Sequence, residues 1–165
     1  MGKRYIDCSA RELAAYHKKE LLQSIADSEG RVLAAETIGT VTPMLVNITN
    51  AEFVTSLGAD IIMLNIFDVD HPVINGLPEV APEDTIHEIK RLTGKMHASG
   101  ILSESGEKIL TKEDAEAFIE AGADIHHIGD SGYMGMALPE NITAYSVAIR
   151  GKRHTYRRMA MSLGR

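Results

Sequence analysis

The sequence lacks the features that form disulfide cross-links or anchor a chain in a membrane. A single cysteine, Cys8, among 165 residues excludes an internal disulfide. No apolar run is long enough to cross a bilayer, and no charged start precedes an apolar stretch. We therefore expect neither a membrane span nor a signal peptide, and the cytoplasm is the default location.

Acidic residues are absent from the end of the chain. From Arg150 onward there are six lysines or arginines and no acid, although the whole chain has a net charge of -6. Such a basic tail can dock on an acidic neighbour, reach an anionic ligand or bind nucleic acid. Tryptophan is absent and aromatic residues make up only 5% of the chain, so no stacking platform favours nucleic acid.

The composition is that of one ordinary globular domain covering residues 1–165. Hydrophobic residues make up 44% of the chain and charged residues 24%, which suffices for a real core. Ser9 and Glu12 fit a capping box that starts an N-terminal helix, which we expect to end near Ser28 within the segment 1–30. Residues 138–165 predict two basic helices interrupted by Gly151.

Between these ends, helices alternate with buried strands. Val32–Thr37 and Asp60–Ile66 are short apolar runs typical of buried parallel strands. Helices are expected at residues 50–57, with Asn50 as the cap, at 82–94 and from residue 111. After Gly94 a strand is due, yet the next residues are poorly apolar, and a weak strand near 100–102 is the better candidate.

An internal repeat indicates how the chain is built. Ala51–Ile61 recurs 64 positions later as Ala115–Ile125, with identical Ala, Glu, Gly, Ala, Asp and Ile positions. Each copy reads as a helix, a glycine cap and a strand, which predicts an α/β fold with a parallel sheet. Three good strands and a weak fourth fall short of the eight in a closed barrel, so the sheet is open or completed by a second chain. An unpaired edge favours a homo-oligomer.

The segment 123–141 is the strongest local functional signal. A short apolar run ends at Gly129, a loop rich in glycine follows, and Pro139 fits the first position of a helix. A loop before a helix start can bind an anion, because backbone N–H groups and the helix dipole both point at it. A plain tight turn is the equally simple alternative.

Four stretches resemble a bacterial family often labelled phosphoenolpyruvate phosphonomutase-like, and sometimes haloacid dehalogenase-like hydrolase. They are VLAAETIGTVTP (32–43), GADIIMLNIFDVD (58–70), GKMHASG (94–100) and ADIHHIGDSGYMGMALPENITAYSVAIRGKRHTYRRM (123–159). The resemblance implies a (β/α) barrel, of which this chain would be a partial or half barrel. It also implies an activity on a small phosphorylated or carboxylated metabolite, with magnesium stabilising an enolate or phosphoryl oxygen.

Polar residues gather where the predicted strands end. In parallel sheets and barrels, ligands bind at the carboxyl ends of the strands. Glu36, Asp68 and Asp70 could hold Mg²⁺, which prefers oxygen ligands, or they could be solvated loop acids. Candidate ligand-binding residues are Asn65, Ser131, Gly132 and Gly135, with Arg150 and Arg153 as supplementary cations. Asp60 and Asp124 begin strands, so we assign them structural roles.

Three histidines are candidates for catalysis. His126 and His127 are adjacent and must point to opposite faces of a strand, so one can transfer protons near neutral pH while the other packs under a helix. His97 is a candidate through the resemblance. The predicted catalytic set is Glu36, His97, His127 and Asp130. The alternative function is a non-catalytic half-barrel module that binds or assembles through its open edge and basic tail.

Overall fold

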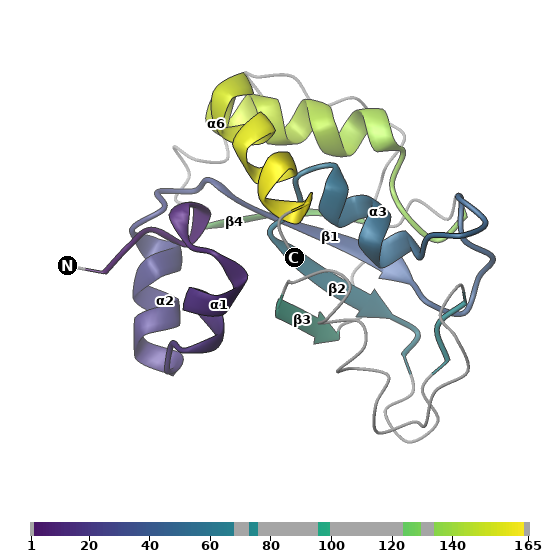
Figure 1. The fold of residues 1–165 in the computed structure, drawn as a ribbon, viewed down its shortest axis with the longest axis horizontal. Coiled ribbons are helices and arrows are strands. Elements are labelled where there is room, and N and C mark those ends of the chain that lie inside the picture. The colour runs from purple at the N-terminus through teal and green to yellow at the C-terminus, as the bar shows by residue number, and fades with distance from the viewer. Residues whose placement is uncertain (1, 68–72, 76–95, 100–123, 130–133, 164–165) are drawn as a thin grey trace.

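The computed structural model of the chain describes residues 2–67, 73–75, 96–99, 124–129 and 134–163 (Figure 1). Its elements in chain order are η1 (Tyr5–Asp7), α1 (Ala10–Ala14), α2 (Lys18–Ala26), β1 (Val32–Ile38), α3 (Asn50–Ser56), β2 (Ile61–Asn65), β3 (Met96–Ser99), β4 (Ile125–Ile128) and α6 (Pro139–Leu163). The helices expected at 82–94 and from residue 111 lie outside the described residues.

The described strands form one parallel sheet in the order β3-β2-β1-β4. The register pairs Ala34 with Ile61 between β1 and β2, and Ala34 with His127 between β1 and β4. The predicted α/β class and parallel sheet are confirmed. β3 lies at Met96–Ser99, where the sequence has almost no apolar run, and its pairing with β2 defines this strand. The weak strand expected near 100–102 lies outside the described residues.

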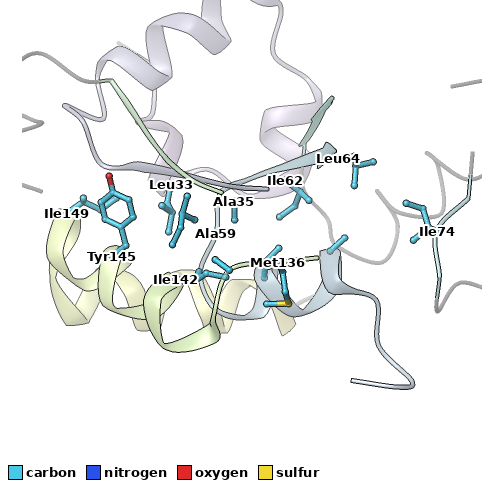
Figure 2. Close-up of a cluster of buried hydrophobic side chains, with 14 residues drawn as sticks. Leu33, Ala35, Ala59, Ile62, Leu64, Ile74, Met136, Ile142, Tyr145 and Ile149 are labelled. Carbon is cyan, nitrogen blue, oxygen red and sulfur yellow. The ribbon is translucent and has the colours of Figure 1, made fainter. Parts of the chain in front are cut away.

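The two faces of the sheet are covered by different parts of the chain. α3 and α6 pack on one face, where the core contains Leu33, Ile62 and Ile142 (Figures 1 and 2). We call this the helix-covered face. The N-terminal segment packs on the opposite face, where Tyr5 and Ile6 contact the start of β1 in a second core cluster.

The N-terminal segment forms two helices rather than one. The predicted capping box is present, since Ser9 Oγ accepts from the Glu12 amide at 3.3 Å and the Ser9 amide donates to Glu12 at 2.8 Å. The expected single helix to Ser28 is wrong, because α1 ends at Ala14 and α2 begins at Lys18. The reason is a second capping interaction, in which Glu20 accepts from the His17 amide at 2.8 Å.

Gly151 breaks α6 into two segments, as predicted. Its φ of 75° and ψ of 163° are not helical, and a φ in this range favours glycine. A chain of hydroxyls spans the break: Ser146 Oγ lies 3.0 Å from Thr155 Oγ1, which donates to the Gly151 carbonyl at 3.0 Å. These hydrogen bonds connect the two segments across the break.

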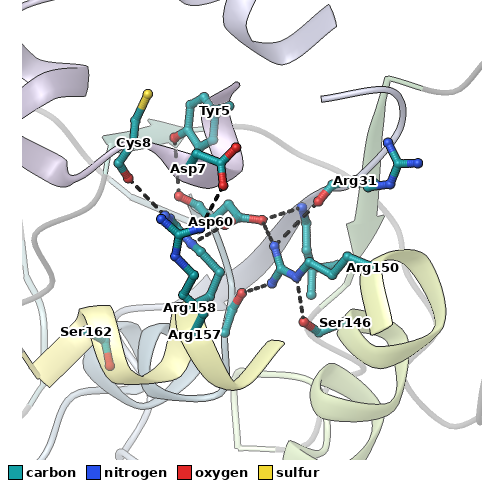
Figure 3. Close-up of polar contacts among 12 residues, drawn as sticks. Tyr5, Asp7, Cys8, Arg31, Asp60, Ser146, Arg150, Arg157, Arg158 and Ser162 are labelled. Carbon is teal, nitrogen blue, oxygen red and sulfur yellow. Dashed lines mark hydrogen bonds and ion pairs between the residues drawn. The ribbon is translucent and has the colours of Figure 1, made fainter. Parts of the chain in front are cut away.

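Asp60 is the buried centre of a charged network at the amino end of β2 (Figure 3). Its carboxylate pairs with Arg150 and, at 2.7 Å, with Nε of Arg158, and it accepts from the Leu33 amide at 2.9 Å. The carbonyl of Asp60 accepts from the Tyr5 hydroxyl at 3.3 Å. Asp60 has the structural role that its position at a strand start predicts.

Three basic residues of the tail form ion pairs with other residues of the same chain. Arg150 and Arg158 pair with Asp60, and Arg157 pairs with Asp7 at 2.9 Å. Arg158 also donates to the Cys8 carbonyl at 3.1 Å, so the tail holds the N-terminal segment. The acidic neighbour on which the tail docks is therefore the body of its own chain.

In the described part of the chain, no helix has both the length and the apolar character that a bilayer crossing requires.

We predict that Asp60→Ala is strongly destabilising. Removing the carboxylate leaves two buried guanidinium groups without their shared partner, which costs about 3–5 kcal/mol when a buried pair is broken. Urea unfolding of the variant measures this loss. The matched control is Asp7→Ala, which removes the shared partner of Arg4 and Arg157, both more than a third exposed, and should cost about 1 kcal/mol. Equal losses in the two variants would contradict the central role of Asp60.

Candidate functional site

Glu36 is a fully buried carboxylate in the second half of β1. Side chains alternate along a strand, so Glu36 shares the face of Val32 and Ala34, opposite the helix-covered face. Across β2 its register partner is Met63. The N-terminal segment packs on Val32 and Ala34, and Glu36 lies beyond it toward the carboxyl end of the strand.

His127 of β4 reaches the same face and forms a pair with Glu36. Its Nε2 lies 3.5 Å from Glu36 Oε2, and its side chain is 24% exposed whereas that of Glu36 is 0% exposed. This separation is longer than an ordinary N–H···O hydrogen bond but close enough for strong attraction once the imidazole is protonated. The pair therefore places a carboxylate acceptor beside a partly accessible imidazole, a combination that suits proton transfer.

His126 points to the helix-covered face, as alternation predicts. Its Nε2 lies 2.9 Å from the Gly30 carbonyl and its Nδ1 lies 2.9 Å from the Tyr145 hydroxyl. Because a carbonyl only accepts, Nε2 carries the proton and Nδ1 accepts from Tyr145. Burial lowers the pKa of His126 below its ordinary value, against a smaller opposing effect of the hydrogen bond to Gly30. His126 is thus the structural member of the histidine pair.

The Glu36–His127 pair lies where the strand order reverses. The order runs β3, β2, β1 and then β4, so β1 and β4 are neighbours in space although β2 and β3 lie between them in sequence. Ligands of open α/β sheets bind at the carboxyl ends of the strands at such a reversal. The topology thus brings together two candidates that are 91 residues apart, since Ala34 pairs with His127.

The turn that carries Gly135 is fixed against the end of β1. The Ile38 amide donates to the Gly135 carbonyl at 2.7 Å, and Thr37 forms a bridge with Met136. Asn50 donates to the Met134 carbonyl at 2.6 Å. Met134 and Gly135 both have positive φ, at 48° and 73°. The described part of the glycine loop is therefore a turn held against the carboxyl end of β1, the strand that carries Glu36.

Sequence reasoning missed the part that Asn50 plays in this turn. Asn50 was expected to cap α3, but Thr49 is the cap, and Glu52 completes a capping box with it. The Asn50 side chain instead accepts from the Met44 amide at 3.0 Å and donates to Met134. Asn50 is 84 residues from Met134, and no local sequence signal indicates that contact.

Asn65 lies at the carboxyl end of β2, as predicted. Its Oδ1 accepts from the Ile66 amide at 2.8 Å, and Ile66 has a φ of 51°. A positive φ is a strained conformation for a β-branched residue, and strain of this kind concentrates at functional sites. The local role of Asn65 is to hold the backbone of Ile66.

The remaining predicted residues fall into three groups. Arg150 does not lie at the glycine turn: its guanidinium pairs with Asp60 at the opposite end of the strands, so its predicted ligand-binding role is corrected to a structural one. Arg153 is exposed on α6, and His97 lies in β3 in register with Ile62. The others lie outside the described residues: Asp68, Asp70, Asp130, Ser131 and Gly132.

The described residues contain no group of three or more His, Cys, Asp or Glu that could hold a metal ion. The predicted magnesium site depends on Asp68 and Asp70 in addition to Glu36, so it stays a prediction.

A family model described as Domain of unknown function (DUF7916) matches residues 6–95 and 120–165. The chain belongs to this family. Both matched segments contribute to the site, since Glu36 lies in the first and His127 in the second. No curated protein and no solved structure matches the chain.

Acidification should weaken the fold through His126. Its folded-state pKa is lowered from 6.5, so below about pH 6.5 the unfolded chain binds a proton that the folded chain resists. The stabilising effect is complete above that pH and is lost as pH falls toward the folded-state value, by at most about 1.4 kcal/mol per pH unit. Urea unfolding from pH 8 to 5 measures it. His126→Gln should flatten this part of the profile, and an unchanged profile would contradict the assignment.

Gly135→Ala should disturb the turn held against the carboxyl end of β1. A Cβ at this position would clash with Val41 and approach the Ile38 carbonyl to 3.1 Å, and the φ of 73° disfavours alanine. We expect a loss of more than about 1 kcal/mol in thermal unfolding. Gly2→Ala is the control, because a Cβ there meets nothing within 4 Å. A Gly135→Ala variant as stable as the wild type would show that this turn is not fixed.

Proposed function

We propose that the chain is an enzyme of the phosphonomutase or lyase type, acting on a small phosphorylated or carboxylated metabolite. The observation that carries this proposal is the pairing of buried Glu36 with partly accessible His127 at the reversal of strand order. A proton-transferring imidazole next to a carboxylate suits chemistry that makes or quenches an enolate. The sequence resemblance to the phosphonomutase-like (β/α) barrel family points to the same class of reaction.

Each part of the site has a role in this proposal. His127 transfers the proton, and Glu36 orients its imidazole and stabilises its charged form. The glycine-rich segment that the sequence predicts to bind an anion, of which Gly135 is described, would hold the anionic group through backbone N–H groups. Asn65 keeps the end of β2 in place through its bond to the Ile66 amide.

Magnesium would be held by Glu36 together with Asp68 and Asp70. The structure supports one part of this donor set, because Glu36 is a carboxylate at the carboxyl half of a parallel strand, of the type that Mg²⁺ prefers. When bound, the ion would stabilise negative charge on an enolate or phosphoryl oxygen.

The second candidate function is a module that assembles without catalysis. It is favoured by the exposed Ile125 in β4, a strand that pairs on one side only among the described residues. Under this alternative the Glu36–His127 pair contributes to folding, and no small anion binds to it.

Thermal unfolding in the presence of ligands tests the enzymatic proposal. We expect magnesium with phosphate, phosphoenolpyruvate or a sugar phosphate to raise the melting temperature of the wild type by several degrees. Binding to the native state alone stabilises it by about 2.7 kcal/mol at a hundredfold excess over Kd. Glu36→Gln and His127→Gln should lose this shift.

The control variant is His154→Gln, which changes a histidine on α6 away from the pair and should keep the full ligand shift. A wild-type chain that melts cooperatively and responds to none of these ligands would contradict the enzymatic proposal and favour the assembly module.

A further inference from the structure

Both edge strands of the described sheet pair on one side only. β3 pairs with β2, and β4 pairs with β1, so among the described strands each has one hydrogen-bonding side that meets no neighbour. All three pairings are parallel. Unpaired sheet edges favour association with another strand.

The internal repeat allows the exposure of the same residue to be compared in β2 and in β4. Ile61 and Ile125 occupy the same position of the repeat and are both the first residue of a strand. Ile61, in a strand with neighbours on both sides, is 8% exposed, whereas Ile125 is 41% exposed. The same residue in the same local motif therefore lacks the cover that a second neighbouring strand gives to Ile61.

The strand order and the helix positions match an arc of a barrel. In a closed barrel the last strand returns beside the first, which is how β4 lies beside β1. α3, which follows β1, and α6, which follows β4, pack together on one face, as the helices outside a barrel do (Figures 1 and 2). The N-terminal segment, which precedes β1, covers the amino half of the opposite face.

We propose that two copies of the chain close one eight-stranded parallel barrel. Each copy supplies the four described strands, and two such arcs give the number that a (β/α)-barrel requires. A two-fold axis along the barrel places β3 of each copy beside β4 of the other and keeps every strand parallel. The interface is the same on both sides, as a closed symmetric dimer requires.

Closing the barrel completes the candidate site. The carboxyl half of the face, which carries Glu36 and His127 beyond the N-terminal segment, becomes the lining of the barrel mouth, and the second copy supplies the other half of that mouth. Ile125 is covered at the new junction. This assembly does not rest on the chemistry proposed for Glu36 and His127, and it can be tested without a ligand.

Light scattering on the full chain after size-exclusion chromatography tests the assembly. We expect a dimer, and a melting temperature that rises with protein concentration, because subunit association stabilises the folded state by mass action. Ile125→Lys places a charge at the junction and should weaken the dimer at least about tenfold. Its matched control is Val46→Lys, at an apolar residue that is 82% exposed away from the sheet edge, which should leave the dimer intact.

A monomeric wild type with a melting temperature independent of concentration would overturn the proposal, as would a dimer that both lysine variants affect equally. If Ile125→Lys does not fold, Ile125→Gln replaces it, and the concentration dependence of the wild type alone still decides. A monomer that nonetheless gains stability from the anionic ligands would reject the assembly while supporting the enzymatic proposal. A dimer that responds to no ligand would do the reverse.

Discussion

The carboxylate of Asp60 is the group that connects the sheet, α6 and the N-terminal segment. It is fully buried and receives the Leu33 amide of β1 and guanidinium groups from both segments of α6. A charge without solvent requires such partners, since its desolvation costs several kcal/mol. The pairing that compensates this cost also fixes where α6 lies relative to the sheet. Arg158 then links the network to the N-terminal segment through the Cys8 carbonyl.

This arrangement separates stability from chemistry along the strands. The charged network occupies the amino ends, where Asp60 precedes β2, and the Glu36–His127 pair and the Gly135 turn lie toward the carboxyl ends. Positive φ at non-glycine residues occurs at both ends, at Glu29 before β1 and at Ile66 and Met134 on the carboxyl side. The firmly held amino end allows the other end to keep a buried carboxylate beside His127. This division is the one that parallel α/β folds use for binding.

Local patterns predicted much of the fold. The capping box at Ser9, the break at Gly151 and the opposite directions of His126 and His127 each depend on a few neighbouring residues, and each is found as expected. Interactions between distant segments were not predictable in this way. The charge of Arg150 alone predicts a ligand-binding cation, whereas its partner Asp60 is 90 residues away in the sequence. The same holds for Asn50 and for β3, which is defined by its neighbour β2.

In the candidate site, too, the residues were predictable from local sequence but their pairing was not. Glu36 and His127 were both proposed from their positions at strand ends, but only the placement of β4 beside β1 makes them a pair. The two copies of the Gly-Ala-Asp-Ile motif lie in different environments. In the first copy the aspartate is the buried centre of the charged network, and in the second copy Asp124 is exposed and precedes β4, which pairs on one side only among the described strands. Identical local sequence thus has opposite environments, so the difference arises from what lies beside the strand. The chain would gain the second neighbour of β4 from another copy rather than from its own described strands.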